Sequence, residues 1–362
     1  MRATPLDGVQ AVVLVGGQGT RLRPLTLATP KPMLPAAGVP LLTHLLCRIA
    51  GAGVRHVVLG TSYRAEVFAE HFGDGRALGL RLDYVVEDEP LGTGGGIRNA
   101  AAALSEPDVL VFNGDVLSGV DPCDVVRTHR GAGADVTLHL VRVPDPRPYG
   151  CVPTGDDGRV LAFHEKSDDP PTDQINAGCY AFRREVIESI PAGRPVSVER
   201  ETFPGLLAAG AHVHAHVDTS YWLDLGTPAA LVQGSADLVR GVAPSAARPG
   251  AAGDALMLDG AVVAPDARVG GGSAVGAGCV VGPGASVMGS VLMDGSRVGE
   301  GAVVSRSVLG AGARVGAGAE LHDAVIGDGA VIGARCELRD GARVWPGVVL
   351  PDGGIRFSPD VS

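Results

Sequence analysis

The chain has very few lysines, few aromatic residues and no long apolar run. Of its 30 basic residues only Lys31 and Lys166 are lysines, and its formal net charge is −10. This acidic balance argues against a nucleic-acid surface or an anionic membrane surface. No stretch approaches the ~20 apolar residues of a membrane span, and the N-terminus lacks the apolar core of a secretion signal. We therefore expect a cytoplasmic protein whose partners include neither nucleic acid nor a membrane.

Cysteine is also scarce, and its spacing is uninformative. The six cysteines are scattered, and none forms a Cys-x-x-Cys pair or has zinc-type spacing with histidine. We expect them to be reduced thiols. A hydrophobic content of 45% with a charged content of 19% is typical of a globular protein, and 362 residues suffice for two domains.

A glycine-rich stretch follows the first apolar run, residues 11–15, which is typical of a buried strand. Gly16, Gly17 and Gly19 follow this strand. Because glycine has no β-carbon, backbone N–H groups there can approach an anion closely. The stretch matches neither a P-loop nor a dinucleotide fingerprint, because Leu22 stands where the latter needs a third glycine. A plain turn with surface charges remains the alternative on the glycines alone.

The cations near this stretch favour a polyphosphate site. Arg21 and Arg23 supply planar guanidinium groups, and Lys31 lies between two prolines that restrict the local backbone. A compact ammonium is retained there and at Lys166, in a chain that otherwise uses arginine. A site that must place one point charge between crowded phosphates would select lysine in this way.

Residues 1–241 alternate apolar strand patterns with helix patterns, which predicts an α/β domain with a doubly wound, mostly parallel, Rossmann-like sheet. Ligands in such folds lie at the carboxyl ends of the strands. The glycine-rich stretch and Asp115 both follow apolar strand patterns. We also expect strands at Tyr149–Val152 and Val160–Lys166.

Asp115 and Asp224 are the candidate metal ligands. Each aspartate lies where an apolar strand pattern gives way to a turn. Mg²⁺ prefers carboxylate oxygens and needs few protein ligands where phosphates supply the rest. The two aspartates therefore predict a Mg²⁺ site, although an ordinary Asn-Gly-Asp turn would also explain Asp115.

A linker rich in alanine, glycine and proline spans residues 242–254, and a six-residue period of aliphatic residues fills 255–355. This hexapeptide pattern predicts a left-handed parallel β-helix, with each aliphatic residue stacked inside a triangular prism. Such coils usually serve assembly or regulation, and we expect a homo-oligomer; an acetyltransferase role is the alternative. The expected inward positions are Val263, Val269, Val275, Val281, Val287, Met293, Val298, Val304, Leu309, Val315, Leu321, Ile326, Ile332, Leu338, Val344 and Leu350.

Together these motifs resemble the sugar-nucleotide pyrophosphorylases, and most closely the mannose-1-phosphate guanylyltransferases. The resemblance covers nearly the whole chain. It rests on the motifs at 16–32, 89–93, 113–115, 165–166, 176–178 and 222–228 and on the hexapeptide tail. There are two small departures, at Gly94–Gly96 and at Ser167, and the first bears on the details of the base pocket.

The resemblance implies that a sugar 1-phosphate attacks the α-phosphate of a nucleoside triphosphate and releases pyrophosphate, without a covalent intermediate. Such a reaction needs mainly alignment and charge neutralisation. By the same resemblance, Arg21 and Lys31 hold the triphosphate, Lys166 holds the sugar phosphate, and Asp115 and Asp224 bind Mg²⁺.

The resemblance also assigns substrate contacts. The nucleotide contacts are Leu14, Gly16, Gly17, Gly19, Thr20, Glu87, Glu89, Gly92, Thr93, Asn113 and Gly114. The sugar contacts are Tyr149, Gly150, Glu165, Asn176 and Glu199.

Glu87 favours GTP as the nucleotide. It lies where relatives that use thymidine or uridine triphosphates resemble one another in carrying glutamine, and a carboxylate can accept two hydrogen bonds from guanine. Glu89 is the second candidate for this role. Alternatives are a guanylyltransferase for a heptose 1-phosphate, a glucose-1-phosphate thymidylyltransferase or uridylyltransferase, and a regulatory subunit that binds sugar nucleotide without catalysis.

Overall fold

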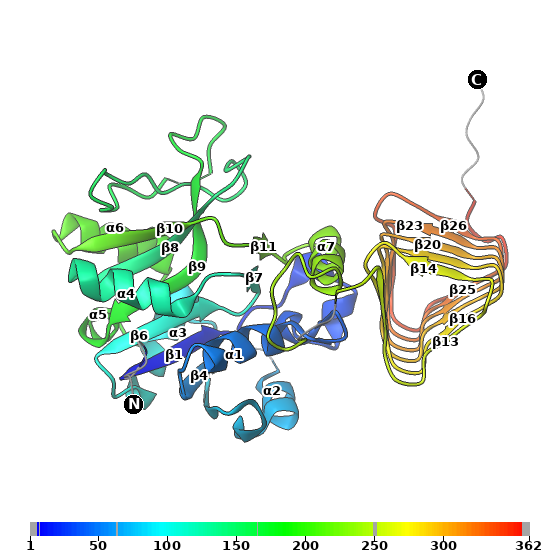
Figure 1. The fold of residues 1–362 in the computed structure, drawn as a ribbon, viewed down its shortest axis with the longest axis horizontal. Coiled ribbons are helices and arrows are strands. Elements are labelled where there is room, and N and C mark those ends of the chain that lie inside the picture. Colours follow the sequence, from blue (N-terminus) through cyan, green and yellow to red (C-terminus); the bar gives the residue numbers. More distant parts are fainter. Residues whose placement is uncertain (1–5, 7, 63, 165, 249–251, 357–362) are drawn as a thin grey trace. The chain divides into compact units, whose positions relative to one another are not determined.

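A computed structural model of the chain describes residue 6 and residues 8–62, 64–164, 166–248 and 252–356. The contacts between residues divide the chain, drawn as a ribbon in Figure 1, into two compact units. The first unit contains the residues up to Gly17 together with Leu45–Trp222, and the second contains Gln18–His44 together with the residues from Leu223 onward. No helix in the described ranges is long and apolar enough to cross a membrane.

The first unit is built on a seven-stranded sheet, and four of its six strand pairs are parallel. Strand β9 is antiparallel to both of its neighbours, β8 and β6. In spatial order the strands are β10 (Val213–Asp218), β8 (Val136–Arg142), β9 (Gln174–Arg183), β6 (Asp108–Asn113), β1 (Val9–Leu14), β4 (His56–Thr61) and β5 (Arg81–Val86). The short strands outside this sheet are β2 (Pro35–Ala36), β3 (Val39–Pro40), β7 (Val116–Ser118) and β11 (Trp222–Asp224).

Helices alternate with these strands along the chain. They are α1 (Leu41–Gly51), α2 (Ala65–Phe72), α3 (Gly92–Asn99), α4 (Pro122–Ala132), α5 (Arg184–Ser189), α6 (Phe203–Ala208) and α7 (Pro228–Val239). Val12 of β1 shares a buried core with Ile97 of α3, whereas Val13, which points to the opposite face, is also fully buried. The sheet is therefore covered on both faces, which confirms the predicted α/β class.

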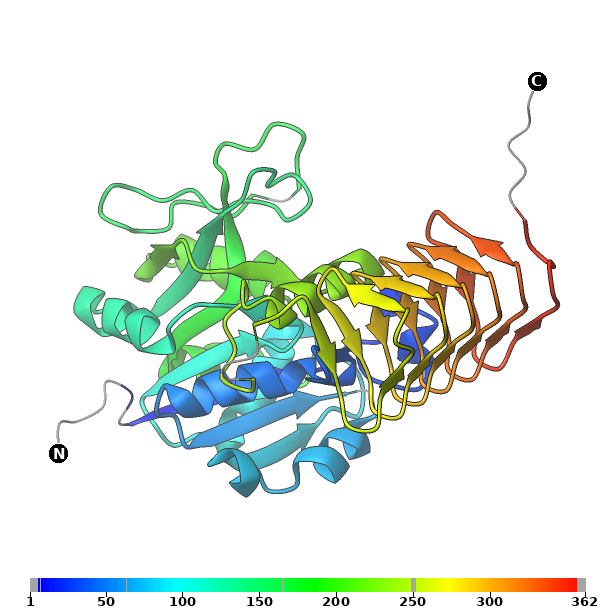
Figure 2. The same ribbon diagram turned by 45° about the vertical axis from the view of Figure 1, so that its right-hand side comes forward.

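The segment between β8 and β9 differs from the prediction. The strands expected at Tyr149–Val152 and Val160–Lys166 are wrong, because the described residues there form only isolated bridges, Cys151 with His164 and Thr154 with Val160. Pro148 and Pro153 flank the first stretch, and each lacks the backbone donor that a ladder would need, while Gly155 and Gly158 lie between the two stretches. The segment forms extended loops beyond the sheet (Figure 2).

The C-terminal part forms three sheets of stacked parallel strands, the triangular prism expected of a left-handed parallel β-helix (Figure 1). The first β-helix sheet contains β12 (Ala255–Met257), β15 (Ser273–Val275), β18 (Val291–Leu292), β21 (Val308–Leu309), β24 (Val325–Ile326) and β27 (Arg343–Val344). The second contains β13 (Val262–Val263), β16 (Val280–Val281), β19 (Arg297–Val298), β22 (Arg314–Val315), β25 (Val331–Ile332) and β28 (Val349–Leu350). The third contains β14 (Arg268–Gly270), β17 (Ser286–Met288), β20 (Val303–Ser305), β23 (Glu320–His322) and β26 (Glu337–Leu338).

The stacking confirms the hexapeptide period with one correction. Val275, Leu292 and Leu309 pair in register and belong to the core of the prism, so the inward residue of that coil is Leu292 and not Met293. A buried serine ladder marks the same repeat: the N–H of Ser290 donates to Ser273 and that of Ser307 donates to Ser290, each 17 residues away. The shortened corner therefore recurs in the steps from Val275 to Ile326, whereas the step from Ile326 to Val344 has the full 18 residues.

Candidate functional site

The exit of strand β1 lies between the ends of its two neighbours in the first unit. The N–H of Val15 donates to the carbonyl of Gly60 at 2.9 Å, and the N–H of Gly114 donates to the carbonyl of Leu14, also at 2.9 Å. A β-carbon on Gly114 would lie only 2.8 Å from that carbonyl oxygen. The sheet thus brings Leu14, Asn113 and Gly114 to one carboxyl edge, where ligands bind in such folds.

Three of the five predicted catalytic residues come together in the second unit. The Lys31 ammonium lies 3.3 Å from Oδ1 of Asp224, and an Arg21 guanidinium nitrogen lies 3.8 Å from Oδ2. The Lys31 side chain is only 9% exposed, whereas that of Arg21 is 67% exposed. One carboxylate therefore holds two cations at different depths.

Glycine is required beside this cluster. Gly19 has φ 55° and begins the 3₁₀ helix Thr20–Leu22. A β-carbon there would lie 3.0 Å from Thr26 Cγ2 and 3.2 Å from Lys31 Cβ. Thr26 Oγ1 donates to the Gly19 carbonyl at 2.8 Å, so the loop is folded tightly around the base of the Lys31 side chain.

The donor set suits a metal that arrives with phosphates. Among the described residues no group of three or more histidine, cysteine, aspartate and glutamate side chains could enclose an ion. Asp224 nevertheless offers a hard carboxylate whose side chain is 27% exposed. A divalent cation that keeps phosphate oxygens and water as its other ligands fits such a site.

Strand β9 carries part of the predicted sugar site. The Asn176 amide donates to the Tyr180 hydroxyl at 2.8 Å and its oxygen accepts the N–H of Gly178. Gly178 has φ 76°, and a β-carbon there would lie 2.8 Å from the Asn113 amide nitrogen. The Asn-Ala-Gly sequence thus lets β9 pass closely over the end of β6.

An aromatic pair adjoins this region. The indole N–H of Trp222 donates to the Ala177 carbonyl at 3.0 Å, and the Tyr149 ring packs edge-on against the indole with centroids 5.2 Å apart. Tyr149 itself is 45% exposed. Trp222 begins the motif at 222–228, but the motif alone does not indicate that the indole binds the backbone of β9.

Thr93 and Glu199, predicted for different substrates, lie in direct contact. The Thr93 hydroxyl donates to Glu199 Oε2 at 2.9 Å, and Ser197 Oγ donates to the same oxygen at 3.0 Å. Glu199 lies on the π-helical turn Val198–Thr202, a geometry frequent at functional sites. Both side chains line a pocket of about 540 Å³ with Gly92, Pro195, Val196, Ser197, Arg200 and Glu201.

Glu87 faces the start of α3. Its Oε2 accepts the N–H of Leu91 at 3.0 Å, and a β-carbon on Gly96 would meet its other oxygen at 2.7 Å. Burial raises the pKa of this carboxyl. The carboxylate is thus held in place by the helix it adjoins. Glu89, the second candidate, is exposed.

The remaining predicted residues lie elsewhere in the first unit. Asp115 is half-buried at the turn between β6 and β7, while Gly150 and Lys166 lie on the long segment between β8 and β9. Glu165 lies outside the described residues. Ser197, which holds Glu199, is the residue that sequence reasoning missed; a serine two residues before a predicted ligand was its only signal.

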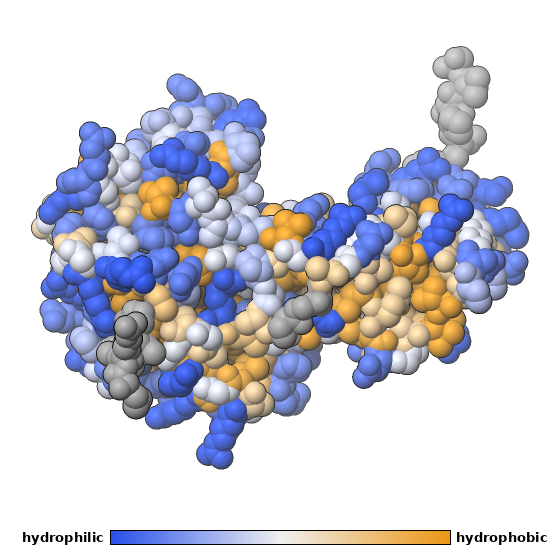
Figure 3. All heavy atoms as spheres, in the orientation of Figure 1, coloured by the Kyte–Doolittle hydropathy of each residue, from blue (hydrophilic) through white to orange (hydrophobic). Residues whose placement is uncertain are grey.

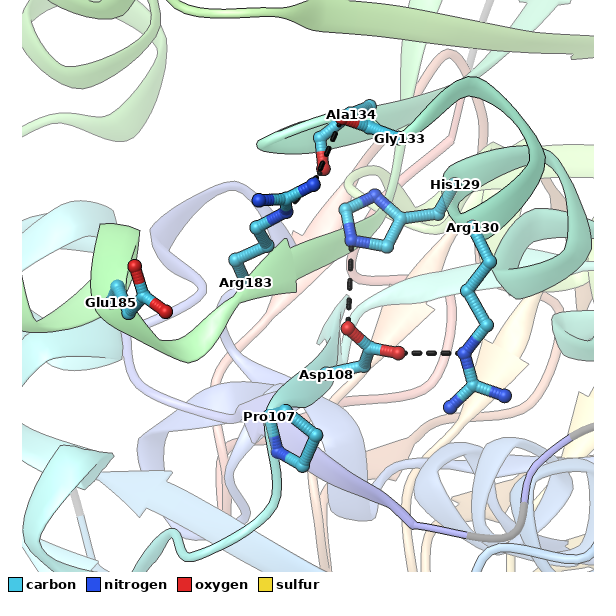
Figure 4. Close-up of a pocket in the computed structure, with 8 residues that line it drawn as sticks. All are labelled: Pro107, Asp108, His129, Arg130, Gly133, Ala134, Arg183 and Glu185. Carbon is cyan, nitrogen blue, oxygen red and sulfur yellow. Dashed lines mark hydrogen bonds and ion pairs between the residues drawn. The ribbon is translucent and has the colours of Figure 1, made fainter.

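A second pocket, of about 330 Å³, lies at the opposite end of β6 (Figure 4). Its charged groups bind one another: Arg130 donates to Asp108 at 2.7 Å, and Arg183 donates to the carbonyls of Gly133 and Ala134. Burial lowers the pKa of His129 to about 4. This pocket is remote from the carboxyl edge of the sheet, and its cations already have partners.

Family comparisons match both parts of the chain. The nucleotidyl transferase model matches residues 10–241, and a model described as the GMPPB C-terminal domain matches residues 251–358. The chain is 63% identical to mannose-1-phosphate guanylyltransferase of Mycobacterium tuberculosis, over 98% of this chain and 99% of that protein.

Other relatives match a shorter region. The chain is 40% identical to the mannose-1-phosphate guanylyltransferase catalytic subunit beta of Drosophila pseudoobscura pseudoobscura, over 61% of this chain and 60% of that one. A crystal structure of HddC from Yersinia pseudotuberculosis complexed with GMP-PN has a TM-score of 0.56 and 29% identity, and covers 63% of this chain and 99% of HddC.

Proposed function

The chain belongs to the nucleotidyl transferase family, and we propose that it transfers a guanylyl group from GTP to mannose 1-phosphate, giving GDP-mannose and pyrophosphate. The relative that is 63% identical over nearly the full length carries this activity in its name. The observation that carries the proposal is the cluster in which Lys31 and Arg21 share the Asp224 carboxylate beside the glycine-rich loop.

The cluster suits the charge changes of this reaction. A phosphate oxygen of the sugar 1-phosphate attacks the α-phosphorus, the bond to the β-phosphate oxygen breaks, and pyrophosphate leaves. Lys31 and Arg21 bind the triphosphate and neutralise the charge that develops on the leaving group. Asp115 and Asp224 would hold Mg²⁺, which supplies Lewis-acid stabilisation of the phosphate oxygens when bound.

A second group of residues, in the first unit, is proposed to bind the sugar 1-phosphate. Lys166 binds the phosphate of mannose 1-phosphate as a flexible point charge. The Glu199 carboxylate accepts hydrogen bonds from sugar hydroxyls, and the Asn176 amide can donate as well as accept. Tyr180 orients Asn176, and Thr93 and Ser197 orient Glu199. Tyr149 and Gly150 border the same region from the long loop.

Glu87 supports guanine as the base. Its carboxylate is fixed by the Leu91 N–H, and each carboxylate oxygen has a further lone pair to offer. Guanine presents two adjacent N–H donors, whereas thymine and uracil present one donor between acceptors. A preference of ~1–3 kcal/mol for guanine is expected from such a bidentate contact.

The proposal is tested by pyrophosphate release in a grid of GTP, ATP, UTP and dTTP against mannose, glucose and heptose 1-phosphates. We expect GTP with mannose 1-phosphate to give the highest kcat/KM. A preference for dTTP or UTP would favour the thymidylyl or uridylyl alternative, and a heptose preference would change the sugar. Binding of GDP-mannose without turnover would favour the regulatory subunit. Asp224→Asn is the loss-of-function control.

We further propose that the β-helix mediates homo-oligomer formation. Apolar side chains remain on the surface of this domain (Figure 3); Val262 is 59% exposed and Val349 is 67% exposed, and both lie on the second β-helix sheet. Exposed apolar residues on one sheet are typical of an interface. Val262→Asp with Val349→Asp should lower the mass measured by light scattering to that of one chain.

A further inference from the structure

Two faces of the β-helix differ in how their outward side chains are covered. Successive residues of a strand point to opposite sides, and Leu309 lies in the prism core, so Val308 on the first β-helix sheet points outward. It is nevertheless 0% exposed, and the paired positions Val291 and Val325 are 3% and 1% exposed. The corresponding Arg314 on the second sheet is exposed. Residues outside the prism therefore cover the first sheet at these three positions, whereas the next outward residue along the stack, Arg343, is exposed.

Two segments of the same compact unit, Gln18–His44 and α7, approach the first coils of the β-helix. A β-carbon on Gly38 would lie 2.8 Å from a Leu258 methyl group, just after β12. A β-carbon on Gly272 would likewise lie 2.6 Å from Cβ of Ala236 in α7. The segment and α7 also bind each other, because the N–H of Ala37 donates to Ser235 Oγ at 2.9 Å. Figure 1 shows α7 beside the β-helix.

One charged contact reaches the glycine-rich loop itself. Arg343 of β27 donates from Nη1 to the backbone carbonyl of Arg23 at 2.6 Å. Arg23 lies between the 3₁₀ helices Thr20–Leu22 and Leu25–Leu27, so a bond at its carbonyl fixes how the first turn, with Arg21, is oriented. Hydrogen bonds from charged donors are stronger than neutral ones.

We propose that Arg343 is a positioning residue for nucleotide binding, and that the first β-helix sheet is the platform on which the triphosphate loop is held. The β-helix then contributes to the nucleotide site of its own chain, besides any role in assembly. This inference rests on the proposed function, since it takes Arg21 and Lys31 as ligands of the triphosphate. It predicts that a side chain more than 300 residues from the loop controls the KM for GTP.

The chain contains a matched control. Arg314 lies in the sequence Gly-Ala-Arg-Val and is exposed, as Arg343 is, but it lies on the second β-helix sheet. We compare Arg343→Ala and Arg343→Lys with Arg314→Ala in the full-length enzyme. Arg343→Ala should raise the KM for GTP roughly three- to tenfold, as expected for the loss of one charge-assisted hydrogen bond. The kcat and the KM for the sugar 1-phosphate should be unchanged, and Arg343→Lys should restore part of the loss.

A second measurement needs no turnover. Amide hydrogen exchange of residues 18–34, measured without nucleotide, should be faster in Arg343→Ala than in Arg314→Ala. Equal KM values and equal exchange in the two alanine variants would overturn the proposal, as would a fall in kcat with KM unchanged. Faster exchange in a protein that does not transfer guanylyl groups would instead support the platform and reject the proposed function.

Discussion

At the scale of single residues, Lys31 and Arg21 share a carboxylate but differ in surroundings. Lys31 is nearly buried and its Cβ packs close to Gly19, while the Arg21 guanidinium extends into solvent. A buried site selects for shape as well as charge, because a planar five-donor fork does not fit where a compact ammonium does. We therefore expect a swap between lysine and arginine to be much more damaging at position 31 than at position 21.

We expect Lys31→Arg to lower kcat/KM for GTP roughly 10²-fold, because the larger group displaces the loop and misplaces the charge. Arg21→Lys, the matched exchange at the exposed position, should lower it less than about tenfold. Steady-state kinetics with thermal unfolding of each variant checks both. Equal losses would show that burial does not distinguish the two sites.

His129 makes folding sensitive to acid. Its imidazole is 2% exposed and burial lowers its pKa to about 4, below the 6.5 of an exposed histidine. Between pH 6.5 and 4 the unfolded chain therefore binds a proton that the folded chain does not, so stability falls as the pH falls through this window.

The variant His129→Gln removes that titration while keeping a polar partner for Thr137, whose hydroxyl lies 3.0 Å from Nδ1. Urea unfolding at pH 7 and pH 4.5 should show a loss of stability on acidification that is smaller by on the order of 2 kcal/mol in the variant. The same pH dependence in both proteins would contradict the assignment.

At the scale of secondary-structure elements, the ends of β1 and β6 approach too closely for any side chain at Gly114. We expect Gly114→Ala to cost about 1–3 kcal/mol of stability, because the new methyl group would meet the Leu14 carbonyl and the backbone cannot yield freely. The kcat/KM for GTP should fall as well. Gly131→Ala in α4, where no atom beyond the adjoining helix backbone lies within 4 Å of the new methyl group, should be neutral or slightly stabilising. Chemical unfolding of both variants provides the comparison.

Elements with a repeated pattern were the most predictable from sequence. The alternation of apolar strands and helices predicted the sheet, and the aliphatic period predicted the β-helix. The shift from Met293 to Leu292 was missed because both residues are apolar and only the register of stacked coils decides which points inward. The segment between β8 and β9 was missed because local apolar residues suggested strands that had no ladder partner.

The candidate site was predictable where one residue carries the chemistry and unpredictable where a residue acts through another. Lys31 and Asp224 were named from their charge and setting, and the structure places them 3.3 Å apart. Ser197 and Arg343 act through Glu199 and a backbone carbonyl. Such contacts depend on tertiary structure: the sequence held one signal for Ser197, its place two residues before Glu199, and none for Arg343.

At the scale of the whole molecule, the compact units do not follow the order of the chain. Residues 18–44 belong with the β-helix although they lie in the N-terminal part of the sequence. Their stability should therefore follow that of the C-terminal coils. Cooperative units of this kind open together in native-state hydrogen exchange.

We expect Leu309→Ala, which leaves a cavity in the β-helix core, to destabilise that unit by about 2–5 kcal/mol. Amide exchange should then rise in residues 18–44 as well as in the coils, and remain unchanged in β4 and β5. Leu59→Ala in β4, at an equally buried position, is the matched variant and should accelerate exchange in β4 and β5 instead. If residues 18–44 respond to Leu59→Ala and not to Leu309→Ala, the loop is stabilised by the sheet of the first unit, and the β-helix is not its support.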